Sequence, residues 1–510
     1  MKKYIIIIIP LFFSIGCKKS FLEITPTDRF TQDTYWNTKD QGEAALNATY
    51  AVLVNSNFIY SARNAVYLDA LTPNTYQYNA DENIISRGLH NAATGKFNTT
   101  WNTSYSGIGR ANNFLANIDK VTMDEALKNR YKAEAKFLRA LYYLPLWNLY
   151  GGAPLITEAT NFETQANLPR NSAAEVLTQI LKDLDEAAAG DILPIAYTGA
   201  DKGRVTRGAV YALKARVLLY AERWEEAAIA AKKVIDLKAY DLFPDYRGLF
   251  YLENEGNQEV IFDIQYKFPE FSHSLDVSLD QQLGTAPLPT LVNDYYATDG
   301  KPIASSAVYN AAKPYENRDS RLQATVIIPG TIFKGAVVTD IQYPSTGYGH
   351  KKYTIFKDNE KPTIVPTSGT SELNYILIRY ADVLLMYAEA QNEAFGPESG
   401  VDKGLTVTDA VNLVRKRAKM PNLPAGLNQL QMQAELRHER RIELAGEGLY
   451  YYDIRRWKIA DQVLNTDIYN IKGARIDNRA FDAARDYLWP IPSIAIQNNP
   501  VLNQNPKYGK

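Results

Sequence analysis

Residues 206–237 have the sequence TRGAVYALKARVLLYAERWEEAAIAAKKVIDL, and this stretch decides the fold. In its first half (209–220) apolar side chains recur every three or four residues, which is the period of an α-helix with one buried face. After a short polar break the same period resumes over 224–235. The stretch therefore predicts two antiparallel helices joined by a tight turn, with small residues at their contact.

The predicted hairpin is close to the length of about 34 residues that a tetratricopeptide repeat (TPR) occupies. Such units bury their apolar faces by stacking, so further helices are expected. A second helical pattern covers 128–152, where Pro145 predicts a kink. Others cover 373–395, followed by 406–420, and then 427–448. The alternative is that these are amphipathic core helices of no repeat family, because only the 206–237 unit has the form of a repeat.

Two long stretches between the helices, 55–106 and 252–372, are rich in Tyr, Asn, Gly, Pro, Ser and Thr. We expect both to be irregular, and irregular segments of this length are usually functional. The chain has 35 Tyr but only 18 Phe, an excess that suits a wet recognition surface better than a dry core. No linker or low-complexity segment divides the chain. The pattern predicts one mainly α domain with ligand-binding loops.

The chain opens with MKKYIIIIIPLFFSIGC. Two lysines precede an apolar stretch, 4–15, that is too short to span a bilayer and is typical of a signal peptide. The only cysteine of the chain, Cys17, follows small residues, as a lipoprotein signal requires. We expect a signal peptide over 1–16, lipid attachment at Cys17 and one tethered domain over 17–510. The alternatives are a secretory peptide with a chance cysteine and a buried N-terminal helix.

Charge and composition argue against several classes of protein. The 56 basic and 57 acidic residues nearly balance, whereas non-specific nucleic-acid binding needs a basic surface. One cysteine allows no internal disulfide and no cysteine-based metal cage. Four scattered histidines argue against a histidine-rich metal site. We therefore expect no metal and no cofactor.

Catalytic motifs are incomplete. The zincin pattern that starts at His438 has Ile442 where a second histidine is needed. Gly107 and Gly109 form half of a dinucleotide loop, without the third glycine. Neither a nucleophile elbow nor a phosphate-binding loop is present. The sequence predicts a protein that is not an enzyme.

A pair of carboxylates for glycoside hydrolysis can always be found among 57 acids, so it is not excluded. The most regular set, Glu439, Glu443 and Glu447, alternates with arginines. We expect ion pairs within one helix, at i,i+3 and i,i+4 spacing, to occupy these glutamates. The arginines concerned are Arg437, Arg440 and Arg441.

The segment RHERRIELAGEGLYYYDIRRW (437–457) resembles a motif of the SusD/RagB family of outer-membrane nutrient-binding lipoproteins. The C-terminal YLWPIPSIAIQNNPVLNQNPKYG (487–509) is similar to the ending of that family. The resemblance follows the family's order from Cys17 onward. Its departures are Pro145 and the residues that follow Cys17, which are Lys18 and Lys19 rather than acidic residues. Further matching stretches are 100–118, 133–156, 212–228 and 377–393.

The resemblance implies a mainly α fold of about four TPR-type helix pairs, with long irregular loops that carry the ligand site. It implies a lipid anchor in the outer membrane, facing the cell exterior. The expected partner is a SusC-like TonB-dependent transporter, to which the lipoprotein delivers a captured glycan or another nutrient oligomer without breaking a bond. The segment 437–457 is then structural. Two rivals stay open: a glycan hydrolase on the same frame, and a peptide-binding lid of the transporter.

Sugar capture uses aromatic rings for stacking, with amides, carboxylates and arginines for the hydroxyls. The early helix region contributes Trp101 and Asn102, although Trp101 is equally suited to anchor that helix in the core. Loop 67–87 and the stretch 340–350 provide the other candidates, for which packing within the loops is the alternative. These are Asp69, Tyr76, Tyr78, Asn79, Arg87, Tyr343 and Tyr348.

Overall fold

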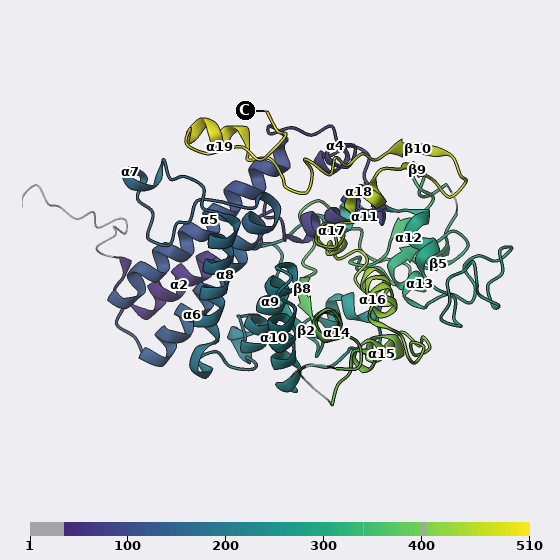
Figure 1. The fold of residues 1–510 in the computed structure, drawn as a ribbon, viewed down its shortest axis with the longest axis horizontal. Coiled ribbons are helices and arrows are strands. Elements are labelled where there is room, and N and C mark those ends of the chain that lie inside the picture. The colour runs from purple at the N-terminus through teal and green to yellow at the C-terminus, as the bar shows by residue number, and fades with distance from the viewer. Residues whose placement is uncertain (1–34, 340, 400, 402–403, 510) are drawn as a thin grey trace, which may run out of the picture.

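The computed structural model describes residues 35–339, 341–399, 401 and 404–509. The predicted signal peptide and Cys17 lie outside these residues. In the described part, helices dominate and the strands form five antiparallel pairs, each of only two strands. Figure 1 shows the long helices side by side, with loops and short strands gathered toward the other end of the molecule. The mainly α class expected from the sequence is confirmed.

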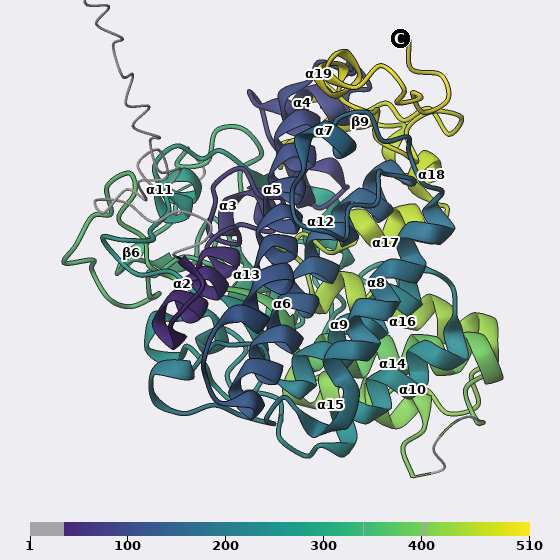
Figure 2. The same cartoon turned by 90° about the vertical axis from the view of Figure 1, so that its left-hand side faces the viewer.

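The long helices pack on one another in chain order and form the scaffold. In the sequence α2, α5, α6, α8, α9, α10 and α14, each helix contacts the next, and α14 also contacts α15 and α16. Figure 2 shows this stacking in α6, α8, α9, α10 and α14. The bounds are α2 Lys39–Tyr50, α5 Gly95–Asn117, α6 Glu125–Pro145, α8 Ala173–Ala188, α9 Arg207–Tyr220, α10 Trp224–Asp236, α14 Tyr380–Phe395, α15 Val407–Arg417, α16 Gln429–Glu443 and α17 Tyr450–Arg456.

The hairpin predicted over 206–237 is α9 and α10. The Thr206 hydroxyl accepts a hydrogen bond from the Ala209 amide at 3.1 Å and caps the start of α9. Glu222, with φ of 57°, makes the turn between the helices. Alanines of both helices, including Ala212 and Ala228, are fully buried, so small residues do line this packing.

The helix expected over 128–152 is α6 followed by one π-helical turn, Leu146–Tyr150. Pro145 is the last residue of α6, because a proline has no N–H to continue the α-type hydrogen bonding. Gly151, with φ of 80°, ends the segment. The expected irregularity at Pro145 therefore takes the form of a change in helix type.

The expectation that 55–106 is irregular was wrong for residues 95–106, because α5 begins at Gly95. This helix is rich in Asn, Thr and Ser, so its intrinsic propensity is low and packing decides its structure. A Cβ atom on Gly107 would lie 2.4 Å from the Tyr142 ring of α6. Gly107 thus permits close packing of two helices, which explains the incomplete dinucleotide pattern.

The helix predicted from 373 begins only at Tyr380. Before it lies β8 (Tyr375–Arg379), a fully buried strand that pairs with β2 (Val260–Ile264). A short apolar run buried on both faces has no distinguishing period, and this one is rich in β-branched residues. Likewise, α16 ends at Glu443 instead of 448, because Gly446 and Gly448 adopt φ of 77° and 71° in a turn.

The stretch 252–372 is loop-rich as expected, with short elements inside it.

Helices α2 and α8 have no counterpart among the predicted elements, although Ser172 and Glu175 form a capping box at the start of α8. The shorter helices are α3 Ala62–Tyr67, α4 Asp81–Ser86, α7 Phe162–Gln165, α11 Leu275–Asp280, α12 Pro289–Asp294, α13 Arg321–Thr325, α18 Ala460–Leu464 and α19 Ser493–Asn498. The other strand pairs are β1 Thr75–Tyr76 with β3 Ala286–Pro287, β4 Val326–Ile327 with β7 Gly349–His350, β5 Ile332–Phe333 with β6 Ala336–Val337, and β9 Asp467–Tyr469 with β10 Arg475–Asn478.

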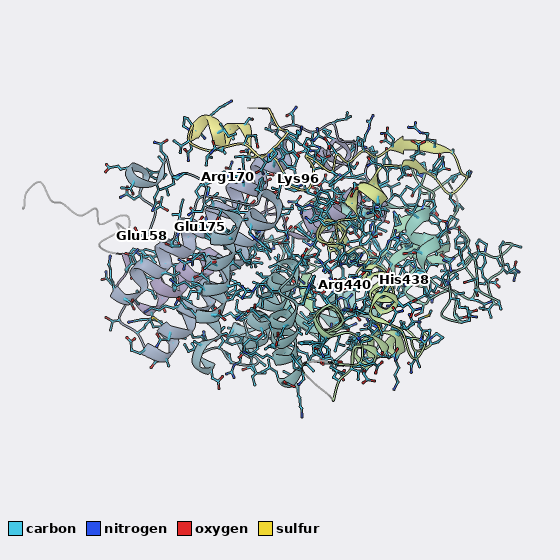
Figure 3. The ribbon with its side chains drawn as sticks, in the orientation of Figure 1. Lys96, Glu158, Arg170, Glu175, His438 and Arg440 are labelled. Carbon is cyan, nitrogen blue, oxygen red and sulfur yellow. The ribbon has the colours of Figure 1, made fainter. Side chains whose placement is uncertain are left out.

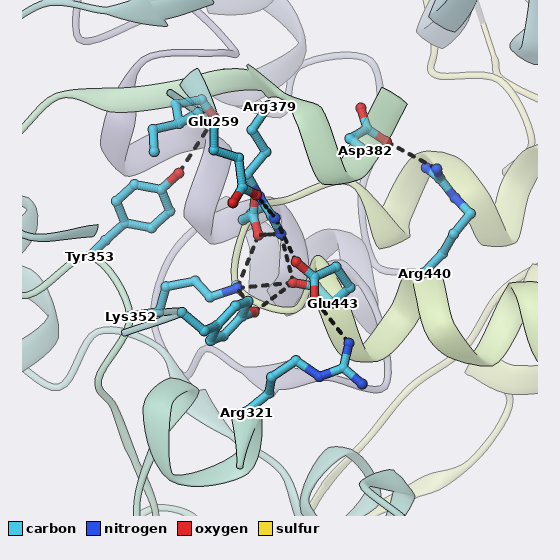
Figure 4. Close-up of polar contacts among 12 residues, drawn as sticks. Glu259, Arg321, Lys352, Tyr353, Arg379, Asp382, Arg440 and Glu443 are labelled. Carbon is cyan, nitrogen blue, oxygen red and sulfur yellow. Dashed lines mark hydrogen bonds and ion pairs between the residues drawn. The ribbon is translucent and has the colours of Figure 1, made fainter. Parts of the chain in front are cut away.

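Glu439, Glu443 and Glu447 are buried in an ion-pair network, and Figure 4 shows the part of it around Glu443 and Arg379. The expectation of pairs within one helix was wrong, because their cationic partners come from other elements. Burial opposes ionisation of Glu443, but the surrounding arginines outweigh it and lower the pKa of this carboxyl. The pairs are Glu439 with Arg321 and Arg415, Glu443 with Arg321, Arg379 and Arg417, and Glu447 with Arg379 and Lys352.

The arginines of α16 also bind outward to other elements. Arg440 reaches Asp382 of α14 at 3.0 Å and Asp453 of α17 at 3.2 Å, and Arg441 reaches Asp294 of α12 at 2.9 Å. The segment 437–457 therefore joins α12, α14, α16 and α17 through ion pairs, of which those of Arg440 are buried and that of Arg441 is partly exposed. This is the structural role expected for it.

Candidate functional site

Loop 67–87 is held in place by β10 and by Arg479, the residue directly after it, about 400 residues further along the chain. Arg479 is buried and donates hydrogen bonds to the carbonyls of Ala70 at 2.9 Å and Thr75 at 2.5 Å. Burial lowers the pKa of Arg479 to about 10. Because both carbonyls belong to the loop, Arg479 fixes its backbone against the strand.

Tyr76, Asn83 and Arg87 converge on the Asp477 carboxylate of β10. Tyr76 Oη donates to Asp477 Oδ2 at 3.1 Å, and Asn83 Nδ2 donates to the same oxygen at 3.0 Å. Arg87 Nε lies 3.2 Å from Asp477 Oδ1. We name the surface formed by Tyr76, Tyr78, Asn79, Arg87 and Asp477 the Tyr76–Asp477 surface.

The groups around Asp477 stabilise its ionised form, and the charge of Asp477 in turn favours the protonated form of Tyr76. Burial opposes ionisation of Asp477, but the Asn478 amide, Asn83, Tyr76 and Arg87 outweigh it and lower the pKa of the carboxyl. Burial and the Asp477 charge raise the pKa of Tyr76 to about 12. The phenol therefore stays protonated at neutral pH, and its hydroxyl is already committed to Asp477.

Tyr78 and Asn79 form the open part of the surface. The Tyr78 side chain is 47% exposed, and its hydroxyl donates to the Gln282 carbonyl at 3.3 Å. The Gln77 side chain accepts from the Asn79 amide at 2.8 Å and donates to the Asn79 side chain, so it fixes the turn. An aromatic ring and an amide are thus presented together to solvent.

Trp101 and Asn102 have opposite environments on α5. Trp101 is only 5% exposed and packs against the rings of Tyr105 and Tyr150, both at centroid distances of 5.2 Å. It therefore has the position of a core anchor. Asn102 is exposed and donates to Asn98 on the preceding turn at 3.1 Å.

The N-terminus of α5 supports α4, which carries part of loop 67–87. Lys96 of α5, which Figure 3 labels, lies 2.6 Å from the Glu82 carboxylate of α4. The early helix therefore contributes to the candidate surface as its support.

Three other candidates lie away from the open surface. Asp69 is fully buried and accepts from the Gly446 amide at 2.5 Å, and burial raises the pKa of its carboxyl to about 7. Tyr343 and Tyr348 are both buried, and the Tyr348 hydroxyl lies 3.1 Å from that of Tyr315. The structure places these three in packing roles within the loops.

Asp477 and Asn83 are the site residues that sequence reasoning missed. Asp477 lies 401 positions from Tyr76, and no local motif marks either residue. Only the pairing of the C-terminal hairpin with loop 67–87 brings them together.

The surface offers two aromatic rings, an amide, a guanidinium and a carboxylate, which is a set suited to binding hydroxyl-rich ligands. Within the described residues, no group of three His, Cys, Asp or Glu side chains is placed to hold a metal ion. None of the helices in that part is long and apolar enough to cross a membrane. The fold defines a class: a TPR-like helical scaffold with long loops, on which the candidate surface lies.

The chain belongs to the SusD family, whose model matches residues 251–508. A second model, described as starch-binding associating with outer membrane, matches residues 21–219. The SusD-like protein P2 of Formosa agariphila is 28% identical, and the match covers 100% of both chains. A SusD-like carbohydrate-binding protein from Bacteroides fragilis has a structure with a TM-score of 0.83 and 28% identity, over 92% of this chain and 100% of that one. The starch-binding protein SusD of Bacteroides thetaiotaomicron is 32% identical over 31% of this chain and 28% of its own length.

Proposed function

We propose that this protein captures a glycan at the cell surface through the Tyr76–Asp477 surface. The observation that carries the proposal is the joint presentation of the exposed Tyr78 ring, the Asn79 amide and the Arg87–Asp477 pair. A pyranose stacks its C–H face on an aromatic ring, and its hydroxyls need fixed polar partners at the rim. Relatives described as carbohydrate-binding and starch-binding support this ligand class.

The protein acts as a lipid-anchored lipoprotein of the outer membrane that faces the cell exterior. Residues 1–16 are its signal peptide, Cys17 carries the lipid, and 17–510 form one domain. The family description that mentions association with the outer membrane supports this location. A SusC-like TonB-dependent transporter receives the captured glycan. Because the step is capture and transfer, no bond of the glycan is broken.

The hydrolase alternative requires two carboxylates that face one glycosidic bond. The regular set Glu439, Glu443 and Glu447 is buried and occupied by arginines and a lysine, which makes it unsuited to that task. Incubation of the purified protein with an oligosaccharide tests the alternative. Release of shorter products that is lost on mutation of a carboxylate pair would replace capture by hydrolysis.

The peptide-lid alternative requires an accessible groove between the scaffold helices. A hollow of about 410 Å³ lies between α8 and α9, but charged side chains line much of it. Two of its ion pairs, Lys214 with Asp185 and Arg223 with Glu226, already join side chains across or along it. The apolar face of a peptide would find little apolar surface to pack against in this hollow, which favours capture of a glycan.

A screen of residues 18–510 against a broad polysaccharide panel, by affinity electrophoresis or glycan array, tests the proposal. Binding of at least one polysaccharide, weakened by Tyr78→Ala, is the expected result. If no polysaccharide binds and the protein co-purifies tightly with a TonB-dependent barrel, the peptide-lid alternative is favoured instead. Co-purification together with glycan binding would support the transfer step.

A further inference from the structure

A pocket of about 520 Å³ opens between α2, the loop 200–204, β2 and the segment that follows β2. Its volume lies within the range of about 300–1,000 Å³ that is usual for sites that bind small molecules. None of the residues of the Tyr76–Asp477 surface lines it. The pocket is therefore a separate feature, and neither a sequence motif nor the candidate surface accounts for it.

Hydrogen bonds and ion pairs hold the floor of the pocket together. Tyr50 Oη donates to the buried Glu134 carboxylate at 2.8 Å and accepts from the Val205 amide at 3.0 Å. Arg204 lies over the Tyr50 ring and binds Glu134 at 3.2 Å and Glu43 at 3.1 Å. These contacts fix the floor in advance, so a ligand would lose little affinity to ordering of the protein.

One wall carries polar groups. Asp263 is 6% exposed, accepts from Asn374 at 2.8 Å and has no cationic partner within the described residues. Gln265 is exposed beside it and lies against Gly203, where a Cβ atom would come within 2.2 Å of the Gln265 amide. Because Gly203 also has φ of 88°, this backbone is adapted to let the amide lie close at the pocket.

The opposite edge is aromatic. Phe271 lines the pocket and is 51% exposed, so its ring is available for stacking at the pocket edge. It is carried by a tight turn, in which the backbones of Lys267 and Phe271 pair at 2.7 and 2.8 Å. Phe268, on the same turn, is 49% exposed but is not part of the lining.

The charges of the lining balance. Glu43 and Asp263 are acidic, whereas Lys202 and Arg204 are basic. A ligand with a net charge of either sign therefore gains little from the pocket as a whole. A neutral ligand with one apolar face and a rim of hydroxyls fits both the Phe271 ring and the amide and carboxylate wall.

We propose that this pocket is a second carbohydrate site, which holds a neutral disaccharide or the end of a neutral oligosaccharide. The sugar stacks on Phe271, and its hydroxyls bind Gln265 and Asp263. Asn47 of α2 also lines the pocket, where Arg204 donates to its side-chain oxygen at 2.9 Å, and its amide is a further donor to the sugar. This inference rests on the proposed carbohydrate-binding role and adds to it a site for short saccharides. The Tyr76–Asp477 surface would then bind the polymer, and the pocket would bind a short segment or a released end.

Isothermal titration of residues 18–510 with maltose, cellobiose, laminaribiose and a glucuronic-acid-containing disaccharide tests the proposal. We expect at least one neutral disaccharide to bind more tightly than the acidic one. Phe271→Ala should weaken that binding at least fivefold, and Gln265→Ala should weaken it measurably. Phe268→Ala is the matched control, because it removes an equally exposed ring from the same turn, and it should change affinity less than twofold.

Absence of binding by every neutral disaccharide would overturn the pocket proposal, and so would equal effects of Phe268→Ala and Phe271→Ala. Tyr78→Ala separates the two sites, because it should weaken polysaccharide binding and leave disaccharide affinity unchanged. Polysaccharide binding without disaccharide binding would refute the pocket alone. Disaccharide binding that depends on Phe271, without polysaccharide binding, would support the pocket and refute the Tyr76–Asp477 surface. The melting temperature of each variant verifies that it is folded.

Discussion

Arg379 Nη1 lies 2.6 Å from Glu443 Oε1 in the centre of the molecule, and both side chains are almost fully buried. Arg379 is the last residue of β8 and directly precedes α14, whereas Glu443 ends α16. Arg379 also binds Glu259 at 2.7 Å and Glu447 at 2.7 Å. One arginine thereby joins the short β2–β8 sheet to two scaffold helices.

Arg379→Met should strongly destabilise the protein, because it leaves three buried carboxylates without their shared cation. Removal of one partner from a buried ion pair typically costs about 3–5 kcal/mol. The free energy of unfolding, measured with urea, checks this. Arg223→Met is the control: it removes a comparable pair with Glu226 from the surface, and we expect a change below about 1 kcal/mol. Similar losses for the two variants would contradict a central role for Arg379.

Gly107→Ala should destabilise the contact between α5 and α6. The new methyl group would lie 2.4 Å from the Tyr142 ring, and overpacking of this kind typically costs about 1–3 kcal/mol. Gly109→Ala provides a matched control two residues along the same helix, because its nearest neighbour is the Thr160 hydroxyl at 3.4 Å. That change should be neutral or stabilise by up to about 1 kcal/mol. Thermal unfolding of both variants distinguishes the two outcomes, and a stable Gly107→Ala protein would refute the packing argument.

Helical periodicity was enough to predict the scaffold where a helix buries one face. Segment 206–237 is the clearest case, with both helices and their turn where the pattern indicates. The pattern was insufficient where burial is complete, as in β8, or where packing stabilises a polar sequence, as in α5. In both, long-range contacts outweigh local preference.

The candidate surface was less predictable than the scaffold, for a related reason. Composition identified loop 67–87 as rich in suitable side chains, and Tyr78 is exposed there. Sequence alone does not distinguish an exposed tyrosine from a buried one, and Tyr343 and Tyr348 are buried. Asp477 has no local signal at all, because its role depends on a contact across 401 positions.

Asp69→Asn should make stability less dependent on pH. Burial raises the pKa of Asp69 to about 7 from 3.8, so the folded state favours the protonated form. Its contribution to stability is therefore fully present below pH 3.8 and is lost as the pH rises through about 7. Asparagine has no charge to bury and still accepts from the Gly446 amide. The stability of the variant relative to the native protein should rise by roughly 3–4 kcal/mol between pH 4 and pH 8. Urea unfolding at several pH values measures the free energy of unfolding of both proteins. The same pH dependence in the variant and the native protein would contradict the prediction.

Tyr78→Ala should weaken polysaccharide binding without changing stability. Its ring is 47% exposed, so truncation leaves no cavity, and its hydroxyl donates to the Gln282 carbonyl at 3.3 Å. Loss of one stacked ring should cost roughly 1–3 kcal/mol, by analogy with aromatic stacking on other flat ligands. Phe162→Ala is the control, because it removes an 81% exposed ring from α7, outside the Tyr76–Asp477 surface. Affinity electrophoresis with the best polysaccharide of the panel measures both. A change below about threefold for Tyr78→Ala, or an equal loss for Phe162→Ala, would place the polysaccharide site elsewhere on the loops.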